Sequence, residues 1–402
     1  MQAKNIDEFV RENAPCYIYQ KEIIDKSCQK LQEKFENIEF LYSIKANPFM
    51  PVIKTIKENG IGSDAASSNE VLLSIKAGME KNQIYYSAPG KTMEDLQKAW
   101  DKCIFIADSF HELDLLEKLA KNHGEILEIG IRVNPNYSMT DKKAHSSKFG
   151  IDEDKIFSFD WTYKNLKLVG LHVHVQSQIL DTNLLSNYYK NTYDLAVKFS
   201  KLSHADIKFI NFGSGIGVAY DKKNEDDVNL DILAKTMKDL YEKNKNELGA
   251  KFLIESGRFL VMDSGVYYTP IIDKKYSNGK TYLVVKNAMN GFVKGPMKEM
   301  LKQALGYECE KAFEPLYTGK NQCEFEIIGE NSQKEIVDIG GHLCTSLDLL
   351  ASDIELKKAN IGDILKVSNA GAYCFSLSIL HFASHDLPKE FLLKKCKNKK
   401  DF

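Results

Sequence analysis

The stretch Leu41-Tyr42-Ser43-Ile44-Lys45-Ala46-Asn47-Pro48 lies where a buried strand is expected to end. The largely apolar run from Ile38 to Ile44 predicts such a strand. Pro48 and Met50 then begin a helical pattern that continues to Asn59. Lys45 is therefore expected at the carboxyl end of a strand, where α/β barrels place their chemistry. A lysine in an apolar setting is also the residue type that forms Schiff bases.

Strand and helix patterns alternate from this stretch to about residue 262. Eight runs predict strands, at 38–44, 61–64, 84–87, 103–107, 127–133, 168–175, 207–212 and 251–255. Helical patterns separate most of them and are clearest at 111–121, 184–202 and 230–248. Eight strands alternating with helices predict an α/β fold of the (β/α)8 TIM-barrel type. A doubly wound sheet is the alternative, but no G-x-G-x-x-G follows the first strand.

The pattern changes after about Met262. Runs rich in valine and tyrosine predict strands at 265–272, 282–285, 322–328, 334–337 and 364–367, separated by turns such as Ser277-Asn278-Gly279. We therefore expect a barrel domain at 22–263 and a β-rich domain at 264–402. A short strand near Tyr17, within residues 1–21, precedes the barrel and is expected to complete the β-rich domain.

The composition excludes several classes of protein. The 402 residues are 43% hydrophobic and 27% charged, which is typical of globular proteins. A formal net charge of −2 gives no overall field for binding nucleic acid or an anionic membrane. No apolar run reaches membrane-spanning length, and the polar N-terminus has no signal-peptide core. The eight cysteines are scattered and read as reduced thiols, so we expect a cytoplasmic protein.

Several polar residues lie at the predicted strand ends, where a barrel collects its functional groups. They are Lys45, Asp64, Ser87, Asp108, Arg132, His174, the loop Gly213-Ser214-Gly215-Ile216-Gly217, and Glu255. The glycine loop can turn backbone N–H groups toward a phosphate, although a plain tight turn has the same composition. Glu255 suits the ring nitrogen of a pyridoxal cofactor, and Arg258 suits a phosphate. A surface Glu–Arg pair is the alternative for these two residues.

His172 and His174 alternate along one predicted strand and are therefore expected to face the same way. A metal site would need further cysteine or carboxylate ligands at suitable spacing, and none is present. We expect no metal. A histidine stacked on a flat cofactor suits the barrel interior better, and a histidine that is merely hydrogen-bonded in the core remains the alternative.

These motifs together resemble the fold type III pyridoxal-phosphate-dependent decarboxylases, the alanine-racemase-like family of the diaminopimelate, ornithine and arginine decarboxylases. Y-S-I-K-A-N, H-V-H-V-Q-S-Q, G-S-G-I-G and E-S-G-R carry the resemblance in the barrel, together with Ser146-Ser147-Lys148-Phe149-Gly150. Two motifs carry it in the β-rich domain, Gly341-His342-Leu343-Cys344-Thr345-Ser346-Leu347-Asp348 and Asn369-Ala370-Gly371-Ala372-Tyr373. The match runs from about Ala14 to Leu392.

The resemblance implies pyridoxal 5′-phosphate as cofactor and assigns roles to particular residues. Lys45 forms the Schiff base, and Cys344 is the candidate proton donor. The implied cofactor contacts are Lys45, Asp64, Arg132, His174, Ser177, Gly213, Ser214, Gly215, Glu255, Gly257, Arg258 and Tyr373. The candidate substrate contacts are Lys148, Lys294, His342, Thr345 and Asp348. Family sites lie at a head-to-tail dimer interface, so the resemblance also implies a homodimer with shared sites.

Departures from the family pattern predict the substrate. Members that act on free diamino acids have an acidic residue after the loop cysteine, which meets the distal ammonium, and Thr345 occupies that position here. A hydroxyl cannot neutralise a buried cation. Gln176, Ser256 and His342 also depart from the usual residues, and Lys294 stands where relatives carry an arginine.

The neutral Thr345, with N-F-G-S-G-I-G-V and E-S-G-R-F-L-V, resembles the siderophore-pathway branch of rhizoferrin and staphyloferrin type. We therefore expect decarboxylation of an N-citryl diamino acid, foremost N-citryl-ornithine, for iron acquisition. The alternative is a diaminopimelate or ornithine decarboxylase. An amino-acid racemase would need a second base across the ring. A non-catalytic homologue of the antizyme-inhibitor kind would be expected to have lost the cofactor residues.

Overall fold

The computed structural model describes residues 6–139, 145–202, 204–307, 313–319 and 321–394. The chain divides into two compact units. The barrel unit comprises residues 27–218 and 226–257, and the sheet unit comprises residues 1–26, 219–225 and 258–402. Residues 22–26, 219–225 and 258–263, which the sequence places in the barrel domain, therefore group with the sheet unit.

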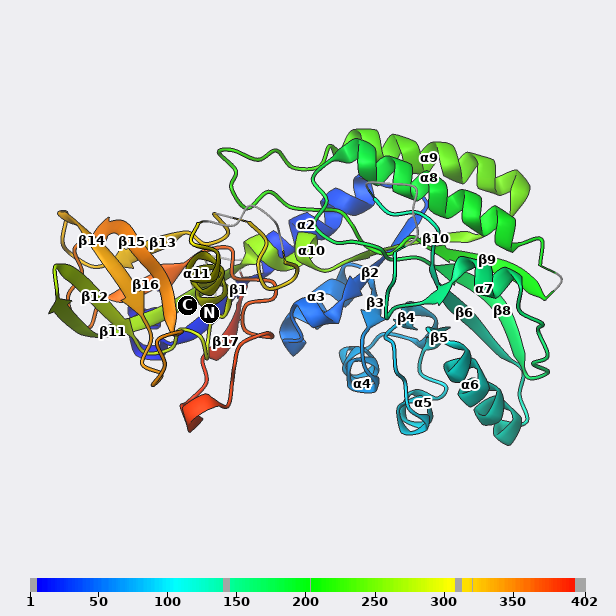
Figure 1. Ribbon diagram of the computed structural model, residues 1–402, viewed down its shortest axis with the longest axis horizontal. Coiled ribbons are helices and arrows are strands. Elements are labelled where there is room, and N and C mark those ends of the chain that lie inside the picture. The colour runs from blue at the N-terminus through cyan, green and yellow to red at the C-terminus, as the bar shows by residue number, and fades with distance from the viewer. Residues whose placement is uncertain (1–5, 140–144, 203, 308–312, 320, 395–402) are drawn as a thin grey trace, which may run out of the picture. The chain divides into compact units, whose positions relative to one another are not determined.

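Parallel strands of the barrel unit close into a barrel among the described residues (Figure 1). Their order around the barrel is β2, β3, β4, β5, β6, β8, β9, β10 and back to β2. Their bounds are β2 Ile38–Ser43, β3 Gly62–Ala65, β4 Ile84–Tyr86, β5 Ile104–Ala107, β6 Leu127–Asn134, β8 Leu166–His172, β9 Ala205–Asn211 and β10 Lys251–Ser256. The predicted α/β barrel is confirmed. A short additional strand, β7 (Ile151–Asp152), pairs with β6 and was not predicted.

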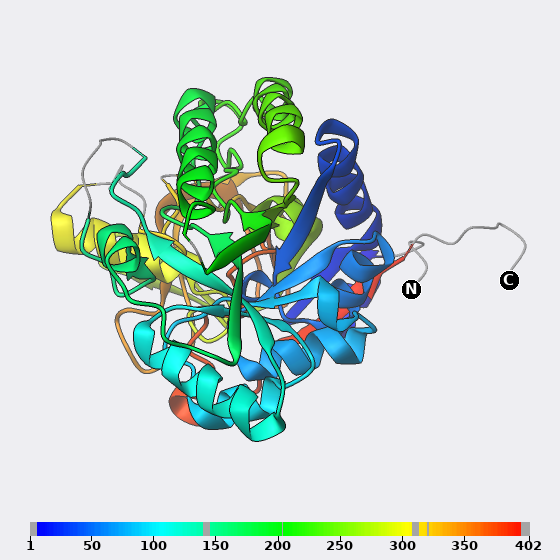
Figure 2. The same cartoon turned by 90° about the vertical axis from the view of Figure 1, so that its right-hand side faces the viewer.

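Helices connect these strands and surround them in the view of Figure 2. They are α2 Lys21–Lys34, α3 Met50–Glu58, α4 Ser68–Ala77, α5 Met93–Ala99, α6 Phe110–His123, α7 Glu153–Phe157, α8 Thr182–Phe199 and α9 Leu230–Glu247. Two 3-10 turns, η2 (Ile44–Ala46) and η3 (Lys81–Gln83), lie among them. Side-chain caps fix several helix starts; for example, Ser67 and Ser109 accept backbone N–H groups of α4 and α6.

Large side chains fill the barrel interior. At two glycine positions they leave no space for a side chain. A buried cluster joins Leu41, Tyr85, Ile106, Val169, Phe209 and Leu253, one residue from each of six strands. A Cβ on Gly170 would lie 1.9 Å from Cζ of Phe209, and one on Gly130 would lie 2.9 Å from the same atom. The Phe209 ring therefore occupies the space that side chains at these glycines would need.

The sheet unit has its own mostly antiparallel sheet, in the order β13-β16-β11-β12-β14-β15, with β1 and β17 attached through β11. The strands are β1 Cys16–Gln20, β11 Gly265–Ser277, β12 Lys280–Val285, β13 Phe325–Ile328, β14 Lys334–Gly340, β15 Leu349–Lys357, β16 Ile364–Val367 and β17 Lys389–Leu393. Its helical segments are α1 Ile6–Asn13, α10 Arg258–Val261, η4 Met262–Ser264, α11 Lys294–Leu305 and η5 Phe382–Ser384.

The early strand β1 belongs to this second sheet. It pairs antiparallel with β11, where Tyr17 lies opposite Tyr267, and parallel with β17, where Tyr17 lies opposite Glu390. Strands β15 and β17 were not predicted from the sequence. No helix within the described ranges is both long enough and apolar enough to cross a membrane.

Candidate active site

Lys45 lies in the turn η2 directly after β2, as the sequence predicts. Its Nζ is 3.9 Å from Oδ2 of Asp64, and about half of its side chain is exposed. The buried Asp64 on β3 accepts hydrogen bonds from Ser43 Oγ at 2.9 Å and from Ser87 Oγ at 2.6 Å. Burial raises the pKa of the Asp64 carboxyl, the charge of Glu255 raises it further, and the Lys45 ammonium opposes both. The lysine amine is thus accessible and faces a fixed carboxyl group.

Glu255 is buried in β10 with two nitrogen groups at the same oxygen. Asn211 Nδ2 donates to Glu255 Oε1 at 2.9 Å, and His172 Nε2 lies 3.1 Å from that atom. Burial alone would raise the pKa of the Glu255 carboxyl. The nearby His172, His174 and Lys45 together outweigh burial and hold this pKa well below its ordinary value. Glu255 is therefore an ionised carboxylate inside the barrel.

His174 lies two residues past the end of β8, and its Nδ1 accepts the backbone N–H of Ser214 at 3.1 Å. Burial lowers the pKa of the imidazole to about 3. Both observations indicate a neutral ring whose other nitrogen, Nε2, carries the proton. Ser177 Oγ lies 3.5 Å from that nitrogen. The sequence-predicted pair His174 and Ser177 therefore lies together, beside the glycine loop.

The glycine loop after β9 requires its glycines. Gly213 has φ +65° and Gly215 has φ +135°, both in the region that favours glycine. A Cβ at Gly213 would lie 2.3 Å from the carbonyl oxygen of Val173, and one at Gly217 would lie 2.7 Å from that of Ile179. The loop thus packs backbone against backbone, with the N–H of Ser214 directed at His174. A glycine turn of this kind lets the backbone approach a phosphate closely, while the N–H groups of Gly213 and Ser214 are bound by Asn211 and His174.

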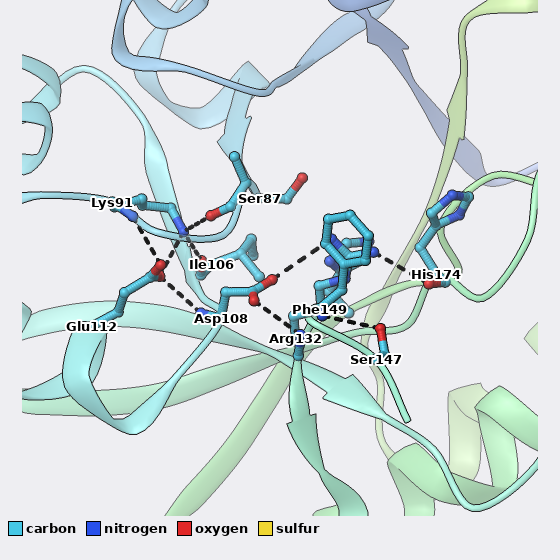
Figure 3. Close-up of polar contacts among 12 residues, drawn as sticks. Ser87, Lys91, Ile106, Asp108, Glu112, Arg132, Ser147, Phe149 and His174 are labelled. Carbon is cyan, nitrogen blue, oxygen red and sulfur yellow. Dashed lines mark hydrogen bonds and ion pairs between the residues drawn. The ribbon is translucent and has the colours of Figure 1, made fainter. Parts of the chain in front are cut away.

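A chain of buried charges lies beside this site (Figure 3). Asp108, which follows β5, accepts the N–H of Gly150 at 2.9 Å and lies 3.6 Å from Arg132 Nη1. Arg132 Nη2 donates to the carbonyl oxygen of His174 at 3.3 Å, and its guanidinium lies 4.6 Å from the centre of the Phe149 ring. Arg132 thus connects His174 to the segment Ser147–Gly150, and Lys148 in that segment is exposed.

A buried ion pair holds the backbone next to Asp108 in place. Lys91 and Glu112 lie 2.8 Å apart, and both side chains are at most 1% exposed. Glu112 also accepts the backbone N–H groups of Lys91 and Asp108, and Lys91 donates to the carbonyl oxygen of Ile106 at 2.7 Å. This pair fixes the backbone at the end of β5, and therefore the position of Asp108.

The sheet unit carries a second group of the predicted residues. Buried Arg258 donates to the hydroxyl of Tyr220 at 2.8 Å, pairs with Glu314, and lies 5.0 Å from the centre of the Tyr373 ring. Lys294 is fully buried and donates to the same Tyr220 hydroxyl at 2.8 Å. Two cations therefore converge on one phenol oxygen. Gly257, which ends the barrel unit, directly precedes Arg258.

The cysteine loop is organised by Asp348. Its buried carboxylate accepts the N–H of Met289 at 2.7 Å and of Leu343 at 2.9 Å. Cys344 is exposed, and the Thr345 hydroxyl accepts the N–H of Leu347 at 3.3 Å. Asp348, a predicted substrate contact, is therefore engaged in holding the loop, whereas Cys344, the predicted proton donor, is accessible.

His342, in the same loop, stacks on His385 with ring centres 3.9 Å apart. Burial, with the charges of His385 and Lys286, lowers the pKa of His342. Its Nε2 is buried and has no hydrogen-bond partner among the described residues. This buried ring nitrogen thus has unused hydrogen-bonding capacity.

The predicted residues form two groups. Lys45, Asp64, Arg132, His174, Ser177, Gly213, Ser214, Gly215 and Glu255 lie within the barrel unit, and Arg258, Lys294, His342, Cys344, Thr345, Asp348 and Tyr373 lie within the sheet unit. Two residues were not predicted: Asn211, which contacts Glu255, and Glu70, which accepts the N–H of Ala66 at 2.6 Å and interacts with the charges of Asp64 and Lys45. Asn211 precedes the glycine loop by two residues, which is a typical spacing for a side chain that accepts a turn N–H. Glu70 had no comparable signal.

The barrel residues fit pyridoxal phosphate. An amine at a strand end, an ionised buried carboxylate, a neutral imidazole and a glycine-only turn match the needs of its aldehyde, ring nitrogen, ring face and phosphate. Within the described ranges, no cluster of three or more His, Cys, Asp or Glu side chains is placed to hold a metal ion.

Comparison with known proteins supports the same chemistry. A family model described as the pyridoxal binding domain of pyridoxal-dependent decarboxylases matches residues 21–262. A diaminopimelate decarboxylase of Aquifex aeolicus (strain VF5) is 30% identical over 379 residues, covering 90% of this chain and 83% of the relative. An L-glutamyl-[BtrI acyl-carrier protein] decarboxylase of Niallia circulans is 28% identical over 394 residues, covering 95% and 89%. A diaminopimelate decarboxylase structure from Helicobacter pylori, complexed with L-lysine, shares the fold with a TM-score of 0.80 and 24% identity, covering 96% of this chain and 93% of that one.

Proposed function

This chain belongs to the pyridoxal-dependent decarboxylase family, and we propose that it decarboxylates an N-citryl diamino acid, foremost N-citryl-ornithine, in the synthesis of a carboxylate siderophore such as rhizoferrin. The reaction class and the cofactor follow from the family: the protein is a carboxy-lyase that uses pyridoxal phosphate, as expected from the sequence. The substrate proposal rests on one observation, the neutral residue Thr345 in the cysteine loop.

When bound, pyridoxal phosphate acts as an electron sink for the bond that breaks at the substrate α-carbon. Lys45 would attach the cofactor, the loop Gly213–Gly215 with Arg258 and Tyr373 would hold its phosphate, and Glu255 would hold its ring nitrogen. Asp64, Arg132, Ser177 and Gly257 complete the proposed set of contacts. These assignments are supported by the accessibility of Lys45 and by the geometry of the glycine loop.

The protonation states of two residues, and the accessibility of a third, suit this chemistry. Glu255 is ionised, so it can keep a ring nitrogen protonated. His174 is neutral, so it can pack against a ring without adding a charge. Cys344 is exposed at a loop tip, where its thiol could return a proton to the α-carbon after CO2 leaves.

Thr345 bears on the distal end of the substrate. Its hydroxyl accepts the N–H of Leu347 and carries no negative charge that could pair with an ammonium group. The nearby carboxylate, Asp348, is buried and accepts two backbone N–H groups. A distal ammonium would find no free carboxylate in this loop, and leaving it unpaired would be costly. A distal amine capped as an amide carries no such penalty.

The citryl group brings carboxylates, which need cations or hydrogen-bond donors. His342 offers its unpartnered Nε2 beside His385 and Lys286, in the loop that contains Thr345. Lys148 is exposed in the segment held by Asp108 and Arg132. Lys294 is committed to Tyr220, so His342 and Lys148 are the better supported citryl contacts.

One relative favours a second candidate. The Niallia circulans protein acts, by its name, on an L-glutamyl group attached to an acyl-carrier protein. Such a substrate also lacks a distal ammonium, and Thr345 is compatible with it. A carrier-bound amino acid is therefore the second candidate, ahead of free ornithine or diaminopimelate.

We further propose that the enzyme is a homodimer whose active sites combine residues of both copies. Lys45 and the cofactor loop belong to the barrel unit, whereas Cys344 and Tyr373 belong to the sheet unit. A head-to-tail dimer would bring the barrel of one copy to the cysteine loop of the other.

The test compares kcat/KM for N-citryl-ornithine, ornithine, lysine, diaminopimelate and a glutamyl-loaded acyl-carrier protein. We expect N-citryl-ornithine to exceed ornithine by roughly 10⁴-fold, because a buried site rejects unmatched polar groups strongly. Equal or reversed values for ornithine or diaminopimelate would overturn the citryl proposal and leave the family assignment intact. A preference for the carrier-bound glutamyl group would select the second candidate.

A further inference from the structure

One buried side chain connects the two parts of the barrel proposed to hold opposite ends of the cofactor. Asn211 is the last residue of β9 and is fully buried. Its Nδ2 donates to Glu255 Oε1 at 2.9 Å, and its Oδ1 accepts the N–H of Gly213 at 2.9 Å. The single amide thus links the proposed ring-nitrogen carboxylate to the first residue of the proposed phosphate loop.

Other contacts leave little freedom around this link. The N–H of Glu255 donates to the carbonyl oxygen of Gly213 at 2.9 Å, so the two residues are also joined through their backbones. His172 Nε2 and Asn211 Nδ2 both approach Glu255 at Oε1, so Oε2 is the oxygen through which Glu255 would meet a ligand. The φ of +65° at Gly213 then directs the chain into the loop. A displacement of Asn211 would therefore move Glu255 and the glycine loop together.

We propose that Asn211 is a positioning residue that sets the spacing and the charge of the cofactor site, by holding Glu255 and Gly213 in one hydrogen-bonded unit. The inference rests on the proposed cofactor contacts of Glu255 and the glycine loop, and it is independent of which substrate the enzyme decarboxylates. Asn211 touches no reacting atom in this proposal. It acts through its two neighbours.

The chemistry of the amide explains why asparagine suits this position. An amide has both a donor and an acceptor, and here each is used once. Aspartate could still accept the N–H of Gly213, but it would place a second carboxylate against Glu255. Two such carboxylates cannot both be ionised at hydrogen-bond distance, so one would take up a proton. Alanine would remove both hydrogen bonds and leave the Gly213 N–H without its partner.

Three variants separate the two connections: Asn211→Ala, Asn211→Asp, and the double variant Asn211→Asp with Glu255→Gln. In the double variant, the new amide at position 255 can donate to the new carboxylate at position 211, which still accepts the Gly213 N–H. Hydrogen-bond geometry is thereby restored, and the negative charge moves away from the ring nitrogen. The measurement is the affinity of each apoprotein for pyridoxal phosphate, followed by visible absorbance, with the melting temperature as a control for folding.

Asn244→Ala is the matched control. Asn244 is also a buried asparagine of the barrel unit, and its amide also uses both groups, donating to the carbonyl oxygen of Ala250 at 2.8 Å and accepting its N–H at 3.2 Å. Its loss should lower the melting temperature without changing the affinity for pyridoxal phosphate. Any general cost of removing a buried amide is thereby accounted for.

We expect Asn211→Ala and Asn211→Asp to weaken cofactor affinity roughly 10- to 100-fold, as expected for two buried hydrogen bonds. The double variant should bind the cofactor more tightly than Asn211→Asp while decarboxylation stays lost, because hydrogen-bond geometry is restored but a neutral amide at position 255 cannot hold the ring nitrogen protonated. Wild-type affinity in both single variants would overturn the proposal. So would a double variant that binds as weakly as Asn211→Asp. Because affinity is read without substrate, neither result depends on the citryl proposal.

Discussion

Asp108 accepts the backbone N–H of Gly150 at 2.9 Å, although 42 positions separate the two residues in the chain. The contact joins the end of β5 to the segment that returns to β6 as β7. Gly150 has φ +74°, and a Cβ there would lie 2.8 Å from the backbone nitrogen of Asn134. The segment that leads into β7 therefore packs closely against β6, and the Asp108 carboxylate holds it there.

Asp108→Ala should loosen this segment, because it removes the acceptor for the Gly150 N–H and the ion-pair partner of Arg132. We expect trypsin to cleave after Lys148 roughly tenfold faster, and KM to rise roughly tenfold with little change in kcat. Cleavage mapped by mass spectrometry and steady-state kinetics provide the measurements. Asp226→Ala, at an exposed position of the barrel unit, is the control. Unchanged cleavage in Asp108→Ala would contradict a positioning role.

Lys45 should be the attachment point of the cofactor, because its amine is accessible at a strand end. Borohydride reduction of the holoenzyme, followed by peptide mapping, should place the pyridoxyl group on Lys45, and Lys45→Ala should lose the label. Lys57→Ala, on the exposed side of α3, should keep the label. A label on any other lysine would refute the assignment.

Mixed dimers test the shared site. Lys45→Ala and Cys344→Ala should each be inactive alone, and mixing them should restore about a quarter of wild-type activity, because random exchange makes half of the dimers mixed and each mixed dimer has one intact site. Native mass spectrometry can verify the exchange. If mixed dimers form and no activity returns, the two residues serve the same copy.

Thr345→Asp should shift the substrate preference toward a free distal ammonium. A new carboxylate in the cysteine loop would pair with that cation, and a charged hydrogen bond of this kind raises kcat/KM for ornithine roughly 10- to 100-fold. Thr345→Asn, which is similar in size and neutral, is the control and should not raise it. The ratio of kcat/KM for ornithine to that for N-citryl-ornithine decides the question. A ratio that is the same in both variants would remove Thr345 from the substrate argument.

The carboxyl group of Glu70 leads to a prediction about how the stability of the protein depends on pH. Burial raises the pKa of its carboxyl to about 7, although the N–H of Ala66 partly opposes this. Between the ordinary pKa and pH 7 the folded state therefore holds a proton that the unfolded state releases, so this group makes the protein less stable as the pH rises through that range. Glu70→Gln should stabilise the protein at pH 8 by on the order of 2 kcal/mol, after allowance for partial solvent screening, and by little at pH 4. Chemical denaturation at both pH values measures the effect, and equal gains at both would contradict it.

The barrel could be predicted because parallel strands buried on both faces form continuous apolar runs. The strands missed by sequence reasoning lack that signal. β7 has two residues, and β15 mixes Asp353, which has a positive φ of +51°, with alternating charged positions. β17 follows Pro388 and begins with two charged residues, Lys389 and Glu390. These strands are defined by their partners in the sheet rather than by their own composition.

Some residues of the candidate site could likewise be predicted from the sequence, and others could not. Lys45, His174, the glycine loop and Glu255 carry chemistry in their residue types and lie at strand ends, so the sequence indicates them. Asn211 was missed because its importance lies in two contacts, one of them to a residue 44 positions away. The burial that raises the pKa of Glu70 likewise exists only after folding. Sequence patterns identify groups that react, whereas the groups that hold them depend on contacts distant in the chain.

The position of β1 between β11 and β17 has a consequence for the order of folding. β1 is synthesised well before β17, yet the two strands pair in parallel from Cys16 to Gln20. The sheet unit therefore cannot be completed until β17 has been synthesised, whereas the barrel strands end at Ser256 and can assemble while translation continues. During that interval β1 is a strand with an unpaired edge, an exposed template for aggregation. Nascent chains stalled before residue 389 should therefore depend on chaperones more than chains that already include β17.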